Sequence, residues 1–100
     1  MRSIFFGLSF LAVASCGPRV TGEVGRACIE ADRRAATRTL CACVQQAANA
    51  TLNGSDQIRA AEFFANPELA QQTRQSDRRT DERFWDRYKV FTQRSQQLCG

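Results

Sequence analysis

Histidine is absent from this sequence, and lysine, methionine, tryptophan and tyrosine each occur once. The missing histidine removes the commonest general base and the commonest metal ligand of proteins. The sequence also places no two carboxyl groups in apolar surroundings and no nucleophile beside a base, which catalysis usually needs. A chain of 100 residues forms one small domain rather than a large catalytic scaffold. We therefore expect no enzyme activity, no catalytic residue, no metal site and no cofactor.

The N-terminal residues 1–15 are typical of a secretory signal peptide. Arg2 gives a basic start, the apolar run Ile4–Ala14 follows without a charge, and small residues close it. A membrane-spanning helix needs roughly 20 apolar residues, so this run is too short for one. We predict that the protein is exported to the bacterial cell envelope. A buried N-terminal helix is the less favoured alternative.

The residues Val13-Ala14-Ser15-Cys16 resemble a bacterial lipobox. The resemblance implies cleavage before Cys16 and lipidation of its sulfur with a diacylglycerol, which would anchor the protein to a membrane. Cleavage after Ala14 is the alternative, and it would give a soluble periplasmic protein. Residues 16–22 contain glycine and proline without a helical period, so we expect a flexible tether there.

The remaining residues 23–100 are expected to form an all-α domain, a small disulfide-stapled helical bundle of four to five helices. No segment alternates polar and apolar residues over the length of a strand, whereas alanine, glutamine, arginine and glutamate are abundant. The expected helices cover residues 23–31, residues 39–52, a segment capped by Ser55 or Asp56, a short segment from Pro67 to about Arg74, and residues 80–98. A polar turn is expected at residues 32–37.

Helix ends and inward faces can also be predicted from the residue types. Asn53-Gly54 is expected to end the second helix, with the glycine in the left-handed conformation. Asn66 is expected to cap the short helix that Pro67 begins. We interpret the aromatic residues as core in preference to the lining of a ligand pocket. The expected inward residues are Leu40, Cys43, Val44 and Ala47, then Ile58, Ala61 and Phe63 or Phe64, then Phe84, Tyr88, Phe91 and Leu98, with Trp85 beside them.

The cysteines predict two disulfides. If Cys16 is lipidated, four cysteines remain and can pair completely. Cys41 and Cys43 would point about 200° apart on a helix, so each needs a different partner. We favour Cys28–Cys41 with Cys43–Cys99, because Cys43 lies on the expected core stripe, and the swapped pairing stays open. In the chain-entropy model the short loop contributes about 3 kcal/mol and the long loop about 4 kcal/mol. A zinc site is the lesser alternative, because two C-x₂₋₄-C pairs are missing.

The C-terminal third of the chain is rich in arginine but not uniformly basic. Acidic residues interrupt the arginines, and Arg78 and Glu82 have the spacing of a helical ion pair. We therefore interpret this segment as a solvated helix face of mixed charge and expect no nucleic-acid partner. Attraction to anionic lipid headgroups would be small beside a lipid anchor. The basic residues are Arg78, Arg79, Arg83, Arg87 and Arg94, and the acidic ones are Asp77, Asp81, Glu82 and Asp86.

Scattered residues along the domain form a pattern that suggests a family. These residues are Cys41, Cys43, Gln45-Gln46-Ala47, Leu52, Gly54-Ser55-Asp56-Gln57, Ala60-Ala61, Phe63-Phe64, Pro67, Arg74, Ser76-Asp77, Phe84-Trp85, Arg87-Tyr88 and Cys99-Gly100. The pattern resembles small exported proteins of alphaproteobacteria, many of which carry the label "arginine transporter". The resemblance covers nearly the whole domain and assigns no role to any residue.

These observations predict a non-enzymatic exported envelope protein, either lipid-anchored at Cys16 or soluble in the periplasm, that acts as an interaction module for another envelope protein. The alternative, which the resemblance implies, is an accessory protein that binds arginine or another amine for a transport system. No segment after the signal peptide could itself cross a bilayer. Binding a guanidinium group needs converging carboxylates, for which Asp77, Asp81, Glu82 and Asp86 are candidates by residue type only.

Overall fold

The computed structural model describes residues 20–31 and 37–100, and within these ranges the fold is a small all-α bundle with two disulfides. This confirms the predicted fold class. The predicted signal peptide, the predicted lipidation residue Cys16 and most of the turn predicted at residues 32–37 lie outside the described residues. The helices are α1 (Glu23–Glu30), α2 (Arg38–Thr51), α3 (Gly54–Ala65), α4 (Glu68–Gln75) and α5 (Arg79–Cys99).

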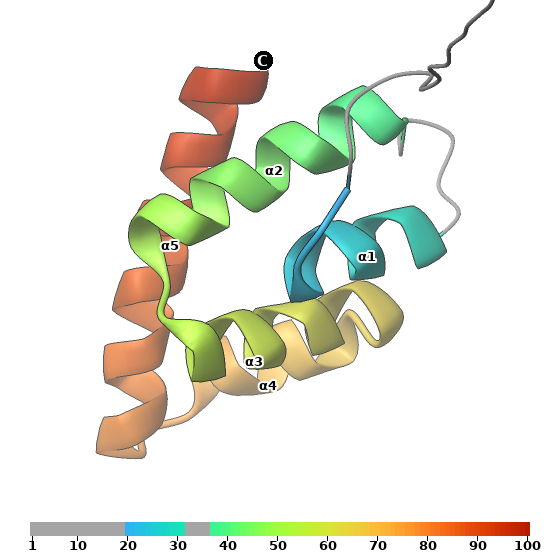
Figure 1. Ribbon diagram of the computed structural model, residues 1–100. Helices are drawn as coiled ribbons and strands as arrows, with labels where there is room; N and C mark the ends of the chain where they lie inside the picture. The colour runs from blue at the N-terminus through green and yellow to red at the C-terminus, as the bar shows by residue number, and fades with distance from the viewer. Residues whose placement is uncertain (1–19, 32–36) are drawn as a thin grey trace, which may run out of the picture.

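The long helix α5 forms one side of the bundle, and the shorter helices lie beside it (Figure 1). α2 crosses the upper part of the molecule in this view and packs against both α1 and α5. α1 packs on α3 below it, and α4 connects α3 to the start of α5. α2 is therefore covered on two sides, whereas none of the described helices lies on the outer side of α5.

The hydrophobic core lies where α2, α3 and α5 meet, and aromatic rings make up much of it. The ring centroid of Phe63 lies 5.9 Å from that of Phe84 and 5.1 Å from that of Tyr88, both in edge-to-face contact. Phe84 and Phe91 are almost fully buried. The aromatic residues are thus core, as predicted. The buried core comprises Val24, Ala47, Ala48, Leu52, Ala60, Phe63, Phe84 and Phe91.

Two disulfides hold α1 and α5 to α2. Cys28 of α1 pairs with Cys41, and Cys43 pairs with Cys99 in the last turn of α5, with Cα atoms 5.6 Å and 5.9 Å apart. This is the first of the two pairings that the sequence left open. Disulfides form and persist in oxidising compartments, so the pairing indicates an exported location. The disulfides join residues 13 and 56 positions apart in the sequence, so each closes a loop that the unfolded, reduced chain would leave open.

Two glycines let α1 approach α2 closely. A Cβ at Gly25 would lie 2.8 Å from the Val20 Cγ1 atom and 3.2 Å from the Gln45 Cβ atom. Gly22 caps α1 with a φ of 97°, and a Cβ there would lie within 2.6 Å of the Gln45 amide group. Val20, Thr21 and Gly22 belong to the expected tether, yet Val20 is half-buried against α1, so the packed domain includes it.

Gln45 fills the space that the glycines leave and satisfies polar groups on three elements. Its Oε1 atom accepts a hydrogen bond of 2.6 Å from the Gly25 N–H, one of the free donors at the start of α1. Its Nε2 atom donates to Asn49 Oδ1 and to Gln57 Oε1, each at 2.8 Å. The side chain is buried and uses its amide fully, so it joins α1, α2 and α3.

The prediction of the inward face of α2 is only partly right. Ala47 is buried, but Leu40, Cys43 and Val44 are half-buried, and the other buried residues of the helix are Cys41, Gln45 and Ala48. The reason is that α1 covers one side of α2 and α5 covers another. A single stripe at helical spacing describes a helix that packs on one side only.

The turn between α2 and α3 also differs from the prediction. α2 ends at Thr51, the following residue Leu52 is extended, and Gly54 is the first residue of α3, without a positive φ. Asn53 is the N-cap instead of Ser55 or Asp56, because its Oδ1 atom accepts a 2.8 Å hydrogen bond from the Asp56 N–H. Only two residues, Leu52 and Asn53, separate the two helices.

Three of the residues expected to face inward do not belong to the core. Ile58 and Leu98 have exposed fractions of 52% and 54%, and Ala61 is half-buried. Asp56, Ala60 and Phe63 are the buried residues of α3. α4 begins one residue later than expected, at Glu68, and Asn66 closes α3 rather than capping α4 with its side chain.

Candidate functional site

A groove of about 450 Å³ lies between α1 and α3. This volume is in the range of small-molecule and side-chain binding sites. Its lining combines small apolar side chains with carboxylates. The apolar lining residues are Ala27, Ala31, Ile58, Ala61 and Ala65, and the charged ones are Glu23, Arg26, Glu30 and Glu62.

The groove exists because alanines face each other across the two helices. Ala27 and Ala31 lie one turn apart on α1, and Ala61 and Ala65 lie one turn apart on α3, so each pair shares a helix face. Methyl groups are too short to fill the space between the helix axes. Ile58 is the largest apolar side chain of the lining and remains half exposed, which leaves apolar surface that a ligand could cover.

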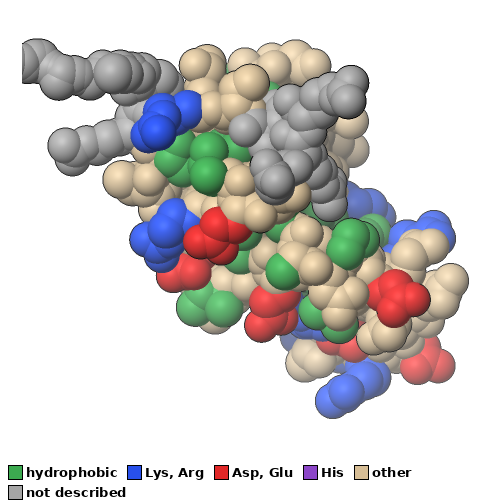
Figure 2. All heavy atoms as spheres, turned by 90° about the vertical axis from the view of Figure 1, so that its right-hand side faces the viewer, with side chains coloured by type: hydrophobic (Ala, Val, Ile, Leu, Met, Phe, Trp, Pro, Cys, Tyr) green, Lys and Arg blue, Asp and Glu red, His purple; other side chains and the backbone are tan. Residues whose placement is uncertain are grey.

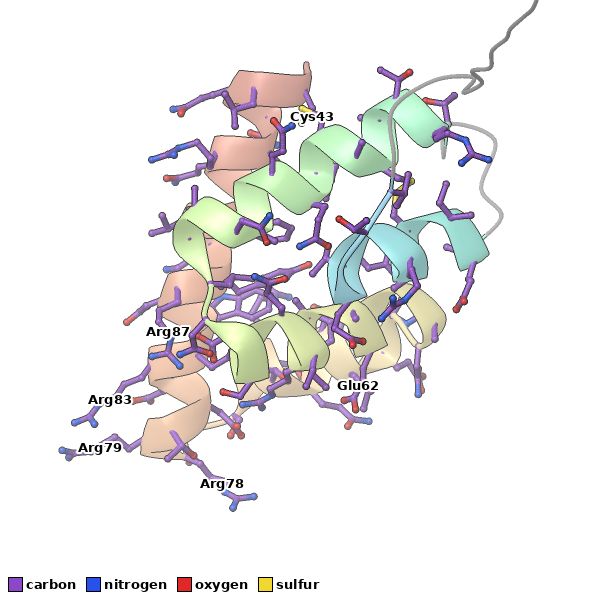
Figure 3. The ribbon with its side chains drawn as sticks, in the orientation of Figure 1. Cys43, Glu62, Arg78, Arg79, Arg83 and Arg87 are labelled. Carbon is purple, nitrogen blue, oxygen red and sulfur yellow. A yellow bond between two sulfur atoms is a disulfide. The ribbon has the colours of Figure 1, made fainter. Side chains whose placement is uncertain are left out.

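The electrostatics of the groove are acidic, although the whole chain carries a net charge of +4. Arg26 donates a 3.1 Å hydrogen bond to Glu23 Oε2, so these two charges compensate each other. Glu30 and Glu62 form no ion pair with another described residue. Figure 3 shows Glu62 on the α3 side, and Figure 2 shows acidic side chains beside exposed hydrophobic ones on the face where α1 and α3 end. The groove can therefore accept a cationic group with an apolar stem.

A second hollow of about 420 Å³ lies between α3, α4 and the start of α5, and four of its polar side chains already have partners: Arg59, Thr73, Ser76 and Asp81. Arg59 donates to Asp81 Oδ1 at 2.5 Å, and the Ser76 hydroxyl donates to Asp81 Oδ2 at 2.7 Å. The guanidinium carbon of Arg59 lies 4.4 Å from the centre of the Phe84 ring. The hydrogen bond from Ser76, followed by that from Arg59, lowers the pKa of Asp81 below its usual 3.8. These contacts join the helices, and we assign this hollow a structural role.

A bidentate ion pair connects α3 to α5. Arg87 donates from Nε to Asp56 Oδ2 at 2.6 Å and from a terminal nitrogen to Oδ1 at 3.0 Å. The side chain of Asp56 is 8% exposed and that of Arg87 46% exposed. The hydrogen bond to Asp56 raises the pKa of Arg87. Asp56 was predicted as a possible cap, and its carboxylate instead holds α5 in place.

The carboxylates that sequence reasoning offered for guanidinium binding do not converge. Asp81 accepts hydrogen bonds from Arg59 and Ser76. The Asp86 Oδ1 atom lies 3.7 Å from the Lys89 Nζ atom on the exposed surface. Asp77 and Glu82 are exposed, and the predicted ion pair between Arg78 and Glu82 is not formed. The candidate site is on α1 and α3, not on α5.

The acidic residues of the groove were not predicted from the sequence, although their spacing is that of residues on one helix face. Glu23, Ala27, Glu30 and Ala31 recur at intervals of three and four, which places them on one face of a helix. Ile58, Ala61, Glu62 and Ala65 repeat the same pattern. Each pattern resembles an ordinary half-exposed helix face, and only the packing of α1 on α3 shows that the two form one groove.

Three further observations complete the description. Among the described residues, no three cysteine, aspartate or glutamate side chains could hold a metal ion. None of the helices in residues 20–31 and 37–100 is long and apolar enough to span a membrane. No protein-family model, curated protein or solved structure matches this chain significantly.

Proposed function

We propose that this chain is an exported, non-enzymatic envelope protein that acts as an interaction module, with the α1–α3 groove receiving a basic segment of an envelope protein partner. The observation that carries the proposal is the pair Glu30 and Glu62 beside the exposed Ile58 in an otherwise positive chain. Two disulfides join α1 and α5 to α2 and so support this small domain without a large core.

The binding free energy that the groove can supply favours a protein segment over a free amino acid as its ligand. An exposed carboxylate–guanidinium pair contributes about 0–1 kcal/mol. A dissociation constant of about 1 mM already requires about 4 kcal/mol. Two carboxylates in an open groove fall short of that value for free arginine. A protein segment adds apolar contacts to Ile58 and the alanines, as well as contacts outside the groove.

An amine-binding accessory protein is the second candidate, and the shape of the groove gives it a specific basis. A methylene stem could lie on the alanines while its guanidinium or ammonium group meets Glu30 or Glu62. Arginine is the amine that the resemblance to the exported alphaproteobacterial proteins implies. Such a protein would deliver its ligand to a separate transporter.

Membrane attachment through Cys16 is also part of the proposal. A lipid on Cys16 would hold the domain at a membrane surface through the segment that precedes Val20, and the soluble periplasmic form is the alternative. Mass spectrometry of the mature N-terminus distinguishes the two. A start at a diacylglycerol-modified Cys16 supports the anchor, and an unmodified start at Ser15 contradicts it.

Nuclear magnetic resonance titration of the exported protein tests the groove. The probes are free arginine, a short amphipathic peptide carrying arginine and leucine, and the same peptide with glutamate in place of arginine. We expect the basic peptide to shift the amide resonances of α1 and α3, with an affinity at least roughly tenfold higher than that of arginine. The double variant Glu30→Gln/Glu62→Gln should lose this binding.

The matched control is Glu68→Gln, which removes an exposed carboxylate of α4 that lies outside the groove. It should bind the basic peptide like the wild type. Binding of arginine as tight as that of the peptide would favour the amine carrier. Absence of shifts in α1 and α3 with every probe, or unchanged binding by the double variant, would refute both functions of the groove.

A further inference from the structure

The solvent face of α5 concentrates arginine in a way that the sequence order hides. α5 buries Phe84 and Phe91 towards the core, and a flank of the helix centred about a quarter of a turn from these two residues is open to solvent. Four arginines and two apolar residues lie along this flank, and all of them are exposed. We call this set the arginine face, and its members are Arg79, Arg83, Arg87, Val90, Arg94 and Leu98.

The acidic residues of α5 lie outside the arginine face. Asp81 is on nearly the opposite side of the helix and pairs with Arg59, and the Asp86 Oδ1 atom lies 3.7 Å from the Lys89 Nζ atom. Arg79, Arg83 and Arg94 form no ion pair with another described residue. Glu82 and Asp86 remain exposed at one edge of the face. The mixed charge that the sequence predicted is thus sorted by the helix into a basic stripe and an acidic edge.

The stripe is long and open. Arg79 and Arg94 are separated by about 22 Å along the axis, at 1.5 Å per residue. Figure 3 shows Arg79 and Arg83 projecting from α5 away from the other helices, on the side where Arg87 also lies. Arg87 stays 46% exposed even while it binds Asp56, so its position is fixed without removing it from the face.

The chemistry of the stripe fits a surface of phosphate groups. The planar guanidinium group binds phosphate oxygens in a bidentate manner and is less strongly hydrated than an ammonium group. Val90 and Leu98 are 51% and 54% exposed among the arginines, so they could contact acyl chains just below the headgroups. A helix with basic residues and exposed apolar residues on one outward side is suited to lying on an anionic bilayer.

We propose that the arginine face docks α5 onto the surface of an anionic phospholipid membrane. The proposal is independent of the α1–α3 groove, which lies on other helices. It is also independent of the lipid on Cys16, because the arginine face would contribute binding even when that lipid is absent. The attraction is electrostatic at first contact and should weaken as salt screens it.

Vesicle sedimentation tests the arginine face, with the Cys16→Ser form of the exported protein so that no acyl chain contributes. The vesicles contain phosphatidylcholine alone or mixed with phosphatidylglycerol. We expect binding to the anionic vesicles only, reduced by added salt. The variant Arg79→Gln/Arg83→Gln should lose roughly thirtyfold in partition coefficient, at about fivefold for each basic residue near the surface.

The matched control is Arg38→Gln/Arg74→Gln, which removes the same charge from exposed positions on α2 and α4. It should change the partition coefficient less than about twofold. Arg79 and Arg83 have no ion-pair partner among the described residues, so thermal unfolding of their variant should match that of the wild type. Equal binding to neutral vesicles, or equal losses in the two variants, would overturn the proposal. Binding to polyglutamate but not to anionic vesicles would overturn it as well, and would indicate an acidic protein partner.

Discussion

At the scale of single residues, the contact between α1 and α2 depends on the fit of Gly22, Gly25 and Gln45. The buried side-chain amide of Gln45 accepts a hydrogen bond from α1 and donates hydrogen bonds to α2 and α3. It can do so only because two glycines leave room for it. A polar group in this position is favourable while every partner is present, and removal of one partner leaves a buried donor or acceptor unsatisfied.

Gly25→Ala is expected to destabilise the protein. The new Cβ would meet Val20 and Gln45 side-chain atoms at 2.8 Å and 3.2 Å, and overpacking of this kind costs about 1–3 kcal/mol. The gain in helix propensity offsets at most about 1 kcal/mol. Urea unfolding measures the result. Gly54→Ala is the control, because nothing lies within 4 Å of its new Cβ, and it should leave stability unchanged or raise it. Equal effects of the two substitutions would contradict the close approach of α1 and α2.

The ion pair of Asp81 predicts that the free energy of unfolding decreases at acidic pH, which we call the acid limb. Its folded pKa lies below 3.8, so its contribution to stability is complete above the unfolded pKa and is lost as the pH falls through 3.8 towards the folded pKa. Ser76→Ala removes the largest cause of the lowered pKa and should move the acid limb to higher pH. Urea unfolding from about pH 7 to about pH 2 measures both profiles. Superimposable acid limbs would show that Ser76 does not act on Asp81.

At the scale of helices, the sequence is a good guide to where each element lies and a poor guide to what it faces. The predicted helices 39–52 and 80–98 differ by one residue at each end from α2 and α5. Local chemistry sets these ends, and local chemistry is visible in a sequence. The inward faces depend on which neighbours cover a helix. Ile58 has the spacing of a core residue in α3, but the alanines of α1 opposite it leave it exposed.

In the candidate site too, features set by local residue types could be predicted, whereas features set by packing could not. The cysteines were recognisable because their chemistry and parity are written in the sequence. The groove combines α1 and α3, whose facing residues are about thirty positions apart in the sequence. It is acidic because Arg26 pairs with Glu23, whereas Glu30 and Glu62 have no ion-pair partner among the described residues. Side-chain pairing of this kind is decided by the fold and not by order along the chain.

At the scale of the whole molecule, the disulfides replace much of the stabilisation that a larger core would supply. Cys99→Ser opens the Cys43–Cys99 loop, which spans 56 residues. In the chain-entropy model this costs about 4 kcal/mol. A domain of this size loses roughly 4–8 °C in melting temperature per kcal/mol, so we expect a decrease of about 20 °C.

Ser95→Ala is the control for this substitution, because it alters the same end of α5 without touching the disulfide. Its Oγ atom is buried and has no hydrogen-bond partner among the described residues, so its removal should leave the melting temperature unchanged or raise it. Differential scanning calorimetry measures both variants. A melting curve of Cys99→Ser like that of the wild type would show that the second disulfide contributes nothing to stability.

We propose that this protein functions outside the reducing cytosol, with its helices held by covalent bonds. Free thiols can be counted on protein purified from its native cells and denatured without reductant. We expect Cys28, Cys41, Cys43 and Cys99 to be unreactive in this protein and to become reactive only after reduction. Four reactive thiols in the unreduced protein would contradict it.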